Sequence, residues 1–127
     1  MEQEPEAKPA TPLIDWVALS RWFGNRQDFI GKLLAMTSAS HGDMLEKLRL
    51  AIQKMDLEAI AFIAHGLRGT ASNLEAQEVQ DRATETEASV RAGRSDSIAL
   101  AKELARLLER LLAELARHLE QGPDGAQ

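Results

Sequence analysis

Apolar residues recur at intervals of three and four positions along most of this chain, and that spacing constrains its fold more than any other feature. The interval matches the 3.6-residue turn of an α-helix, so each such segment places its apolar residues on one face. No segment alternates apolar and polar residues between turn signals, as a half-buried strand would. The sequence therefore predicts an all-α protein. The expected helices span residues 14–23, 26–54, 57–74, 77–92 and a last segment from 95 or 96 to 121.

Short connections between long amphipathic helices favour antiparallel neighbours. We therefore expect an antiparallel up-down four-helix bundle, in which residues 14–23 form a short extra N-terminal helix. The bundle should occupy residues 13–121. Residues 1–12 contain three of the four prolines and are expected to be a disordered tail, and residues 122–127 a flexible C-terminus.

Capping residues mark the expected helix ends. Asp15 and Asp56 are suited to N-caps, because a short carboxylate side chain can accept a hydrogen bond from a free backbone N–H. Gly24 and Gly93 are suited to C-terminal caps, and the pair Gly122-Pro123 is expected to end the last helix.

One stretch of the long second helix leaves two outcomes open. Residues 38–43 read Ser-Ala-Ser-His-Gly-Asp, which predicts either a kink or a true break. His41 is accordingly expected in a loop or kink, and His118, near the chain end, is expected to face solvent. Neither has a metal-ligand partner at helical spacing, so no metal site is expected. The methionines at 36, 44 and 55 are expected to fill the core.

Composition excludes several classes of function. The 127 residues include no cysteine, which excludes disulfides, Cys-ligated zinc and iron–sulfur sites. The net charge of −5 argues against nucleic-acid binding, and no apolar run approaches the length of a transmembrane helix. The N-terminus is acidic where a signal peptide would be basic. We therefore expect a cytoplasmic protein that binds neither nucleic acid nor membrane.

The helix from residue 57 to 74 carries the strongest functional signal. With about 100° per residue and His65 set at zero, the core stripe falls within roughly 40° of the opposite side. That stripe consists of Ile60, Ile63, Leu67 and Leu74. Six residues fall within roughly 60° of His65 and should share its exposed face: Glu58, Ala61, Phe62, Arg68, Gly69 and Ser72.

Three features of that face point to chemistry at His65. Gly66 and Gly69 each cost a helix about 1 kcal/mol relative to alanine, and a missing side chain at 69 would let another protein approach the ring. Phe62 should be exposed beside small residues, which makes a patch fit for docking. Arg68 lies one turn after His65, and a guanidinium can bind phosphate oxygens. A neutral imidazole with an open approach and a nearby cation is suited to carrying a phosphoryl group.

The run from Ala64 to Leu74, AHGLRGTASNL, resembles the signature of histidine-containing phosphotransfer (HPt) domains, whose pattern is His-x-Leu-Lys-Gly followed by small residues and Asn-Leu-Gly. The resemblance covers residues of about 26–120. It implies that His65 is phosphorylated on the ring nitrogen remote from the main chain, that Arg68 replaces the family's lysine, and that Gly69 admits the partner. It also implies a relay between receiver-domain aspartates, without kinase activity.

The resemblance further implies that the partners are receiver domains of a hybrid sensor kinase and of a response regulator. The magnesium ion used in transfer belongs to the receiver, so the chain itself should need no cofactor, and a monomer is expected. Docking should involve Glu58, Ala61, Phe62, Gly66 and Ser72. Because the chain begins with Met1 and a tail, we expect a stand-alone protein.

Two residues depart from the family pattern. Arg68 keeps the positive charge of the usual lysine, but arginine and lysine bind phosphate differently. Glu75 stands where glycine is common after Asn-Leu, at a position distant from the transfer atom. We expect Glu75 to affect the helix end or docking rather than the chemistry.

Alternatives remain. His65 could be an ordinary solvated histidine, although the joint pattern around it argues otherwise. The chain could be a receiver-binding adaptor without chemistry or, less in keeping with Gly66, a histidine-kinase dimerisation domain, whose motif usually reads His-Glu-Leu-Arg-Thr-Pro. The carboxylates at 75, 78, 81, 85 and 87 are interpreted as a solvated acidic face, and Arg91 and Arg94 as favourable charges at a helix C-terminus.

Overall fold

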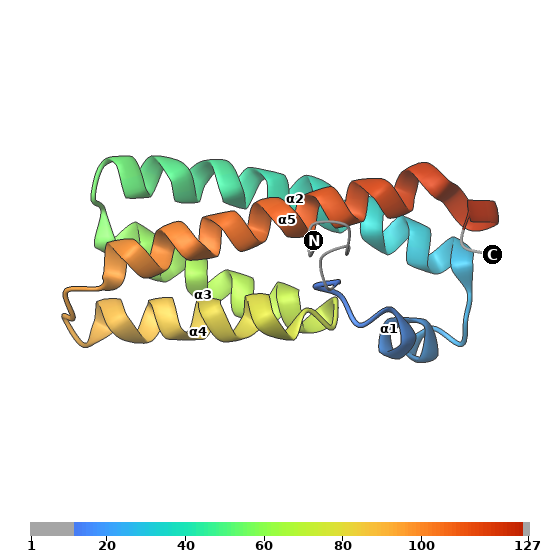
Figure 1. The fold of residues 1–127 in the computed structure, drawn as a ribbon, viewed down its shortest axis with the longest axis horizontal. Helices are drawn as coiled ribbons and strands as arrows, with labels where there is room; N and C mark the ends of the chain where they lie inside the picture. The colour runs from blue at the N-terminus through green and yellow to red at the C-terminus, as the bar shows by residue number, and fades with distance from the viewer. Residues whose placement is uncertain (1–11, 126–127) are drawn as a thin grey trace, which may run out of the picture.

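The computed structural model describes residues 12–125, with side chains to residue 120. Within that range the chain forms helices and no strands, as predicted (Figure 1). A short helix precedes four long ones: α1 (Trp16–Trp22), α2 (Gln27–Gln53), α3 (Leu57–Asn73), α4 (Gln77–Arg91) and α5 (Ser97–Gly125). No helix in residues 12–125 is long and apolar enough to span a bilayer.

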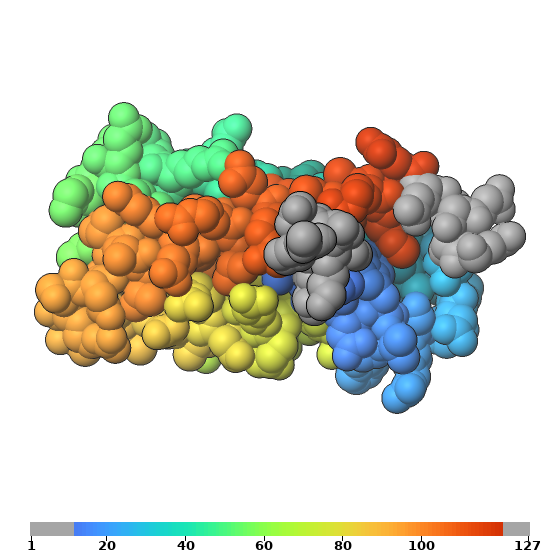
Figure 2. Space-filling model, in the orientation of Figure 1, coloured from blue at the N-terminus to red at the C-terminus, as the bar shows by residue number. Residues whose placement is uncertain are grey.

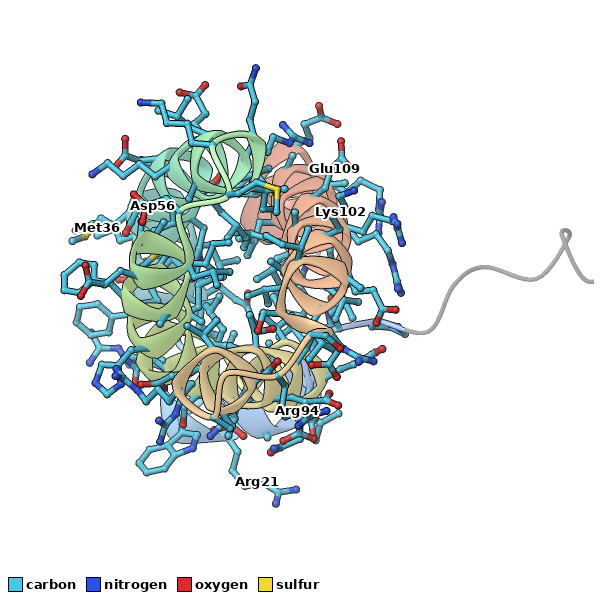
Figure 3. The ribbon with its side chains drawn as sticks, turned by 90° about the vertical axis from the view of Figure 1, so that its left-hand side faces the viewer. Arg21, Met36, Asp56, Arg94, Lys102 and Glu109 are labelled. Atoms are coloured by element: carbon cyan, nitrogen blue, oxygen red, sulfur yellow. The ribbon has the colours of Figure 1, made fainter. Side chains whose placement is uncertain are left out.

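The four long helices form a closed bundle. Helix α2 packs against α3 and α5, and α4 packs against the same two, so each long helix has two neighbours. The short turns make successive helices antiparallel, and the end-on view shows side chains filling the space between the four axes (Figures 1 and 3). The antiparallel four-helix bundle with an extra N-terminal helix is therefore confirmed.

The core is built from the predicted apolar stripes. The α3 residues at 60, 63 and 67 are all buried, as is the C-capping Leu74, and α5 contributes a row of buried leucines. That row consists of Leu100, Leu104, Leu107, Leu108, Leu111 and Leu115. Burial of these side chains supplies the main stabilisation, because each contributes about 1.5–3 kcal/mol when fully removed from water.

The predicted helix caps are confirmed, but the predicted end of the last helix is not. Asp15 accepts a hydrogen bond from Ala18 N and Asp56 from Ala59 N. Gly24 and Gly93 adopt φ of 58° and 69°, the left-handed conformation that ends a helix. The prediction that Gly122-Pro123 ends the last helix is wrong, because α5 continues to Gly125. The fixed φ of proline lies in the helical range, so the backbone can continue past it.

The predicted disordered tail and flexible C-terminus stay predictions. Residues 1–11 and 126–127 lie outside the described residues, and so do the side chains of 121–125. The space-filling view shows the described residues as an elongated body in which α1 lies against one end of the bundle (Figure 2).

Helix α2 is continuous through residues 38–43, so the predicted break is absent. His41 is fully buried, and its Nε2 lies 2.8 Å from Thr70 Oγ1 on α3. The interpretation of His41 as a loop residue is therefore wrong: the small residues around it let it face α3. Two of the three predicted core methionines are also wrong, since Met36 and Met55 are exposed, and Met44 is half-buried.

A buried carboxylate on α5 holds the N-terminal segment in place. Glu114 is 7% exposed and accepts hydrogen bonds from Leu13 N (2.8 Å), Ile14 N (3.1 Å) and the indole Nε1 of Trp16 (2.8 Å). The Trp16 ring also stacks on His118, with centroids 4.0 Å apart. The expectation that His118 simply faces solvent is therefore wrong, because the aromatic face of Trp16 covers it.

Candidate functional site

His65 stands on the outer face of α3, as the helical periodicity predicts. Its side chain is 65% exposed, while Ala64 and Leu67 beside it in sequence are buried. The bundle core therefore fixes the helix, and the helix presents the imidazole to solvent.

The carboxylate of Glu87, on the neighbouring helix α4, lies against that imidazole. Its two oxygens are 3.1 and 3.3 Å from His65 Nδ1. The same carboxylate accepts hydrogen bonds from Arg68 (2.9 Å) and from Arg91 (Nε, 3.0 Å). The Glu87 side chain is only 8% exposed. A buried carboxylate is costly unless it is paired, and here three donors surround it.

This pairing keeps Glu87 ionised. The hydrogen bond from Arg68 is the largest cause that lowers the pKa of Glu87 to about 2, with further lowering by Arg91 and His65 against the opposing effect of burial. Glu87 is therefore an acceptor for hydrogen bonds at neutral pH and not a proton donor.

An ionised Glu87 determines which ring nitrogen of His65 carries the proton. A neutral imidazole has one N–H donor and one acceptor nitrogen, and Nδ1 must donate to the carboxylate. The lone pair is then on Nε2, which makes no hydrogen bond within residues 12–120. Nε2 is the nitrogen remote from the main chain, so the site offers a nucleophile at the atom that the resemblance indicates.

The Arg68 guanidinium lies beside the His65 ring and is already paired with Glu87. One of its terminal nitrogens is bound to Glu87, and its side chain is 44% exposed. A guanidinium has five N–H donors, so Arg68 retains donors for an anion at the imidazole while Glu87 fixes its position.

The two glycines of the motif have different surroundings. A Cβ added at Gly69 would have no atom within 4 Å, which agrees with the predicted open approach. A Cβ at Gly66 would lie 3.0 Å from the Met44 side chain of α2. Gly66 therefore permits close packing of α2 on α3, a reason that the sequence did not suggest.

The family model described as "Hpt domain" matches residues 32–121, well over half of the chain. The chain belongs to the Hpt domain family. The resemblance read from the motif is confirmed, and the family places this Hpt chain in histidine phosphotransfer within phosphorelays. No curated protein matches it.

Solved structures share the fold of the Hpt chain. Histidine-containing phosphotransfer protein B from Pseudomonas aeruginosa PAO1 superposes with a TM-score of 0.75 at 23% identity, over 88% of this chain and 98% of that one. The HPT domain of a sensor hybrid histidine kinase from Shewanella gives 0.76 at 18% identity, over 87% and 97%. At these identities the likeness concerns the fold alone.

The predicted docking residues of the Hpt chain differ in their exposure. Glu58, Phe62 and Ser72 are exposed, Phe62 to 80%, and Gly66 is half-buried. Ala61 is buried at 4%, so its predicted exposure is wrong. Ala61 and Arg68 fall on the same side of His65, the side on which Arg68 reaches Glu87 of α4. A helical wheel gives no information about a neighbouring helix that covers a short side chain.

Sequence reasoning missed Glu87 and the role of Arg91. The interpretation of residue 87 as part of a solvated acidic face is wrong, and Arg91 binds Glu87 in addition to lying in the last turn of α4. One signal was available: Glu87 lies four residues after buried Ala83, in register with the buried face of α4. A charged residue in an apolar stripe requires a partner. Within the described part of the Hpt chain, no group of acidic and histidine residues could hold a metal ion.

Proposed function

We propose that His65 accepts a phosphoryl group from an aspartyl-phosphate of one receiver domain and passes it to an aspartate of another. The observation that carries this proposal is the hydrogen bond from His65 Nδ1 to ionised Glu87, which leaves the Nε2 lone pair free on an exposed ring. Membership of the Hpt family supplies the class of reaction.

The transfer is a displacement at phosphorus. The Nε2 lone pair attacks the phosphorus of the acyl phosphate, an N–P bond forms, and the P–O bond to the receiver's aspartate breaks, so that aspartate leaves as a carboxylate. The ring gains positive charge as the bond forms, and Glu87 stabilises that charge through Nδ1–H. The second transfer runs in reverse, with a new aspartate as nucleophile and neutral imidazole as the leaving group.

Arg68 supports the phosphoryl group in this proposal. Its donors that are not engaged with Glu87 can bind phosphate oxygens, and Gly69 leaves room for the receiver. Magnesium is expected on the receiver and not on this chain. We further propose a cytoplasmic monomer whose partners are receivers of a hybrid sensor kinase and of a response regulator.

A mixing assay tests the proposal. A receiver phosphorylated on its aspartate is incubated with the wild type, with His65→Gln and with His118→Gln as a control histidine variant. We expect acid-labile label on the wild type and on His118→Gln, and none on His65→Gln. Equal labelling of His65→Gln would show that His65 is not the acceptor. A chain that binds the receiver but takes no label would instead be an adaptor without chemistry.

A further inference from the structure

The proposed transfer uses His65, Glu87 and Arg68 but leaves one charged group at the site without a role. Arg91, the last residue of α4, contacts Glu87 through two of its nitrogens, Nε at 3.0 Å and Nη2 at 2.9 Å. Within residues 12–120, Glu87 is the one anion with which Arg91 pairs. An exposed ion pair of this helical spacing contributes only about 0.3–0.5 kcal/mol, but the carboxylate of this pair is nearly buried.

The two oxygens of Glu87 are divided between the two arginines. Oε1 accepts a hydrogen bond from Arg68 at 2.9 Å. Oε2 is contacted by both Arg91 nitrogens, and it is also the oxygen nearer to His65 Nδ1, at 3.1 Å against 3.3 Å for Oε1. Arg91 therefore holds the oxygen that faces the imidazole more closely, and departure of Arg68 from Oε1 would leave that contact in place.

The two arginines belong to different helices. Arg68 lies on α3 one turn after His65, and Arg91 lies on α4 one turn after Glu87. Residues three or four apart on a helix are neighbours, so Arg68 accompanies the imidazole and Arg91 accompanies the carboxylate. The position of Arg91 at the C-terminal end of α4 is also favourable for a cation, because the helix dipole is negative there.

Phosphorylation of His65 Nε2 creates a competition for Arg68. The phosphoryl group places about two negative charges beside the ring, and the Arg68 guanidinium then has two anions to bind. When Arg68 turns to the phosphoryl group, Oε1 of Glu87 loses its donor. A nearly buried carboxylate left with one partner takes up a proton or turns out to solvent. In either case it would stop accepting the hydrogen bond from Nδ1–H.

We propose that Arg91 is a positioning residue for the phosphorylated state, which keeps the Glu87 carboxylate on Nδ1–H while Arg68 binds the phosphoryl group. This inference rests on the proposed function and gives the two arginines separate tasks. With Nδ1 protonated, the receiver's aspartate forms the new P–O bond, the N–P bond breaks, and its electron pair stays on Nε2 of a neutral imidazole. Without the Nδ1 proton the leaving group would be an imidazolate anion, and this second transfer would slow.

The charges around Glu87 agree with this division. The hydrogen bond from Arg68 is the largest cause of the low pKa of Glu87, and the hydrogen bond from Arg91 lowers that pKa further. Within the described residues, Glu87 pairs with groups of α3 and α4 only, and α2 and α5 supply no charged partner. Arg91 is therefore the cation that remains to hold the pKa of Glu87 down once Arg68 is engaged with the phosphoryl group.

The experiment measures transfer from phosphorylated His65 to an unphosphorylated receiver, at saturating receiver so that docking affinity does not enter. The proteins are the wild type, Arg91→Gln, Arg91→Lys and Arg94→Gln, a matched control because Arg94 is an exposed arginine just after α4 that pairs with Asp96. For Arg91→Gln we expect the rate constant to fall at least about fivefold at pH 8 but to stay within about twofold of the wild type at pH 6, where solvent protonates the ring in both proteins. Arg91→Lys should recover most of the rate, and Arg94→Gln should match the wild type at both pH values.

Ring ¹⁵N chemical shifts give a second measurement. Unphosphorylated Arg91→Gln should keep the proton on Nδ1, because Arg68 still holds Glu87, whereas the phosphorylated variant should lose that proton at pH 8 and the wild type should retain it. Unchanged transfer at pH 8, or equal slowing at pH 6 and pH 8, would overturn the inference, since a contact of Arg91 with the phosphoryl group or a purely structural role would not depend on the ring proton. Absence of label on His65 of the wild type would instead overturn the proposed function.

Discussion

Glu87 is a charged residue at an interior position, and its surroundings explain why it is tolerated. Three donors from two helices satisfy its oxygens, so the desolvation of the carboxylate is offset. The same contacts orient His65 and restrain Arg68. Glu87 therefore acts through His65 and is a positioning residue of the proposed site.

Replacing Glu87 by alanine should leave His65 without its Nδ1 acceptor. We expect the ring to populate both neutral tautomers and the rate of transfer from a phosphorylated receiver to fall at least about tenfold, equivalent to about 1.4 kcal/mol. Ring ¹⁵N chemical shifts would report the tautomer. Glu85→Ala is the matched control, since Glu85 is an exposed carboxylate on the same helix that pairs with Arg82. An unchanged tautomer in Glu87→Ala would contradict the positioning role.

Glu75 occupies a backbone conformation that suits glycine. Its φ is 57°, in the left-handed region, where a side chain costs roughly 1–2 kcal/mol. This explains why the family commonly has glycine there, and it assigns the departure to the end of α3 as the sequence suggested. Glu75 is compatible with the fold because the cost of its left-handed backbone is small compared with the free energy gained by burying the core side chains.

Glu75→Gly should therefore stabilise the protein. Relief of the left-handed strain exceeds the extra flexibility of glycine in the unfolded chain, so we expect a gain of about 0.5–1 kcal/mol. Urea unfolding would measure it. Gly93→Ala is the mirror experiment, because Gly93 has φ of 69° and an added Cβ there should destabilise. A lower unfolding midpoint for Glu75→Gly would mean that the Glu75 side chain makes a stabilising contact.

Helix α1 is attached to the bundle by a few buried side chains and by hydrogen bonds to one carboxylate. It has only seven residues, too few to be stable alone. Leu19 and the preceding Leu13 and Ile14 are buried against the bundle, and Glu114 binds the backbone that leads into the helix. Helix α1 should therefore behave as a unit that is ordered by docking.

Glu114→Ala should release α1 while the four long helices stay folded. Loss of the carboxylate would leave buried N–H groups without acceptors, at about 1–3 kcal/mol each, so α1 should open more easily than the four long helices. Hydrogen exchange should accelerate at Leu19 N and stay slow at Leu67 N. Glu109→Ala is the control, since Glu109 is an exposed residue of α5 that pairs with Arg49. Uniform acceleration across all helices would instead show that Glu114 supports the whole core.

For the whole molecule, two buried titratable groups link stability to pH. Burial lowers the pKa of His41 below its ordinary value of 6.5, with the Thr37 backbone in partial opposition. Below pH 6.5 the unfolded chain therefore takes up a proton that the folded chain does not. The free energy of unfolding decreases as the pH is lowered through this range. Glu87 acts in a lower window: its pKa of about 2 lies below the ordinary 4.5, so stability is also lost as pH falls from about 4.5 toward 2.

The variant His41→Leu should distinguish the pH dependence of stability due to His41 from that due to Glu87. The free energy of unfolding of the wild type should decrease between pH 7 and 5, and that of His41→Leu should decrease less, because leucine removes the buried proton site. All other titratable groups are common to both proteins, so the difference between the two curves reports His41. Parallel curves for the two proteins would refute the link.

The sequence by itself determined what depends on a single helix. Periodicity of 3.6 residues fixes which face of α3 is buried, so the core stripe, the exposure of His65 and Phe62, and the open space at Gly69 all followed from local spacing. Short-range capping likewise fixed the starts of α1 and α3. The family could be recognised because its motif lies within eleven consecutive residues.

Only the tertiary structure decided what depends on two helices. Glu87 follows His65 by 22 residues and reaches it because α4 packs against α3. His41 is buried because α3 covers it, Ala61 is buried on the side of α3 toward α4, and α1 lies near the end of α3 because Glu114 and Glu75 hold it there. The physical reason is that spacing along a helix sets direction around its own axis, whereas neighbours across the bundle are set by packing and turns.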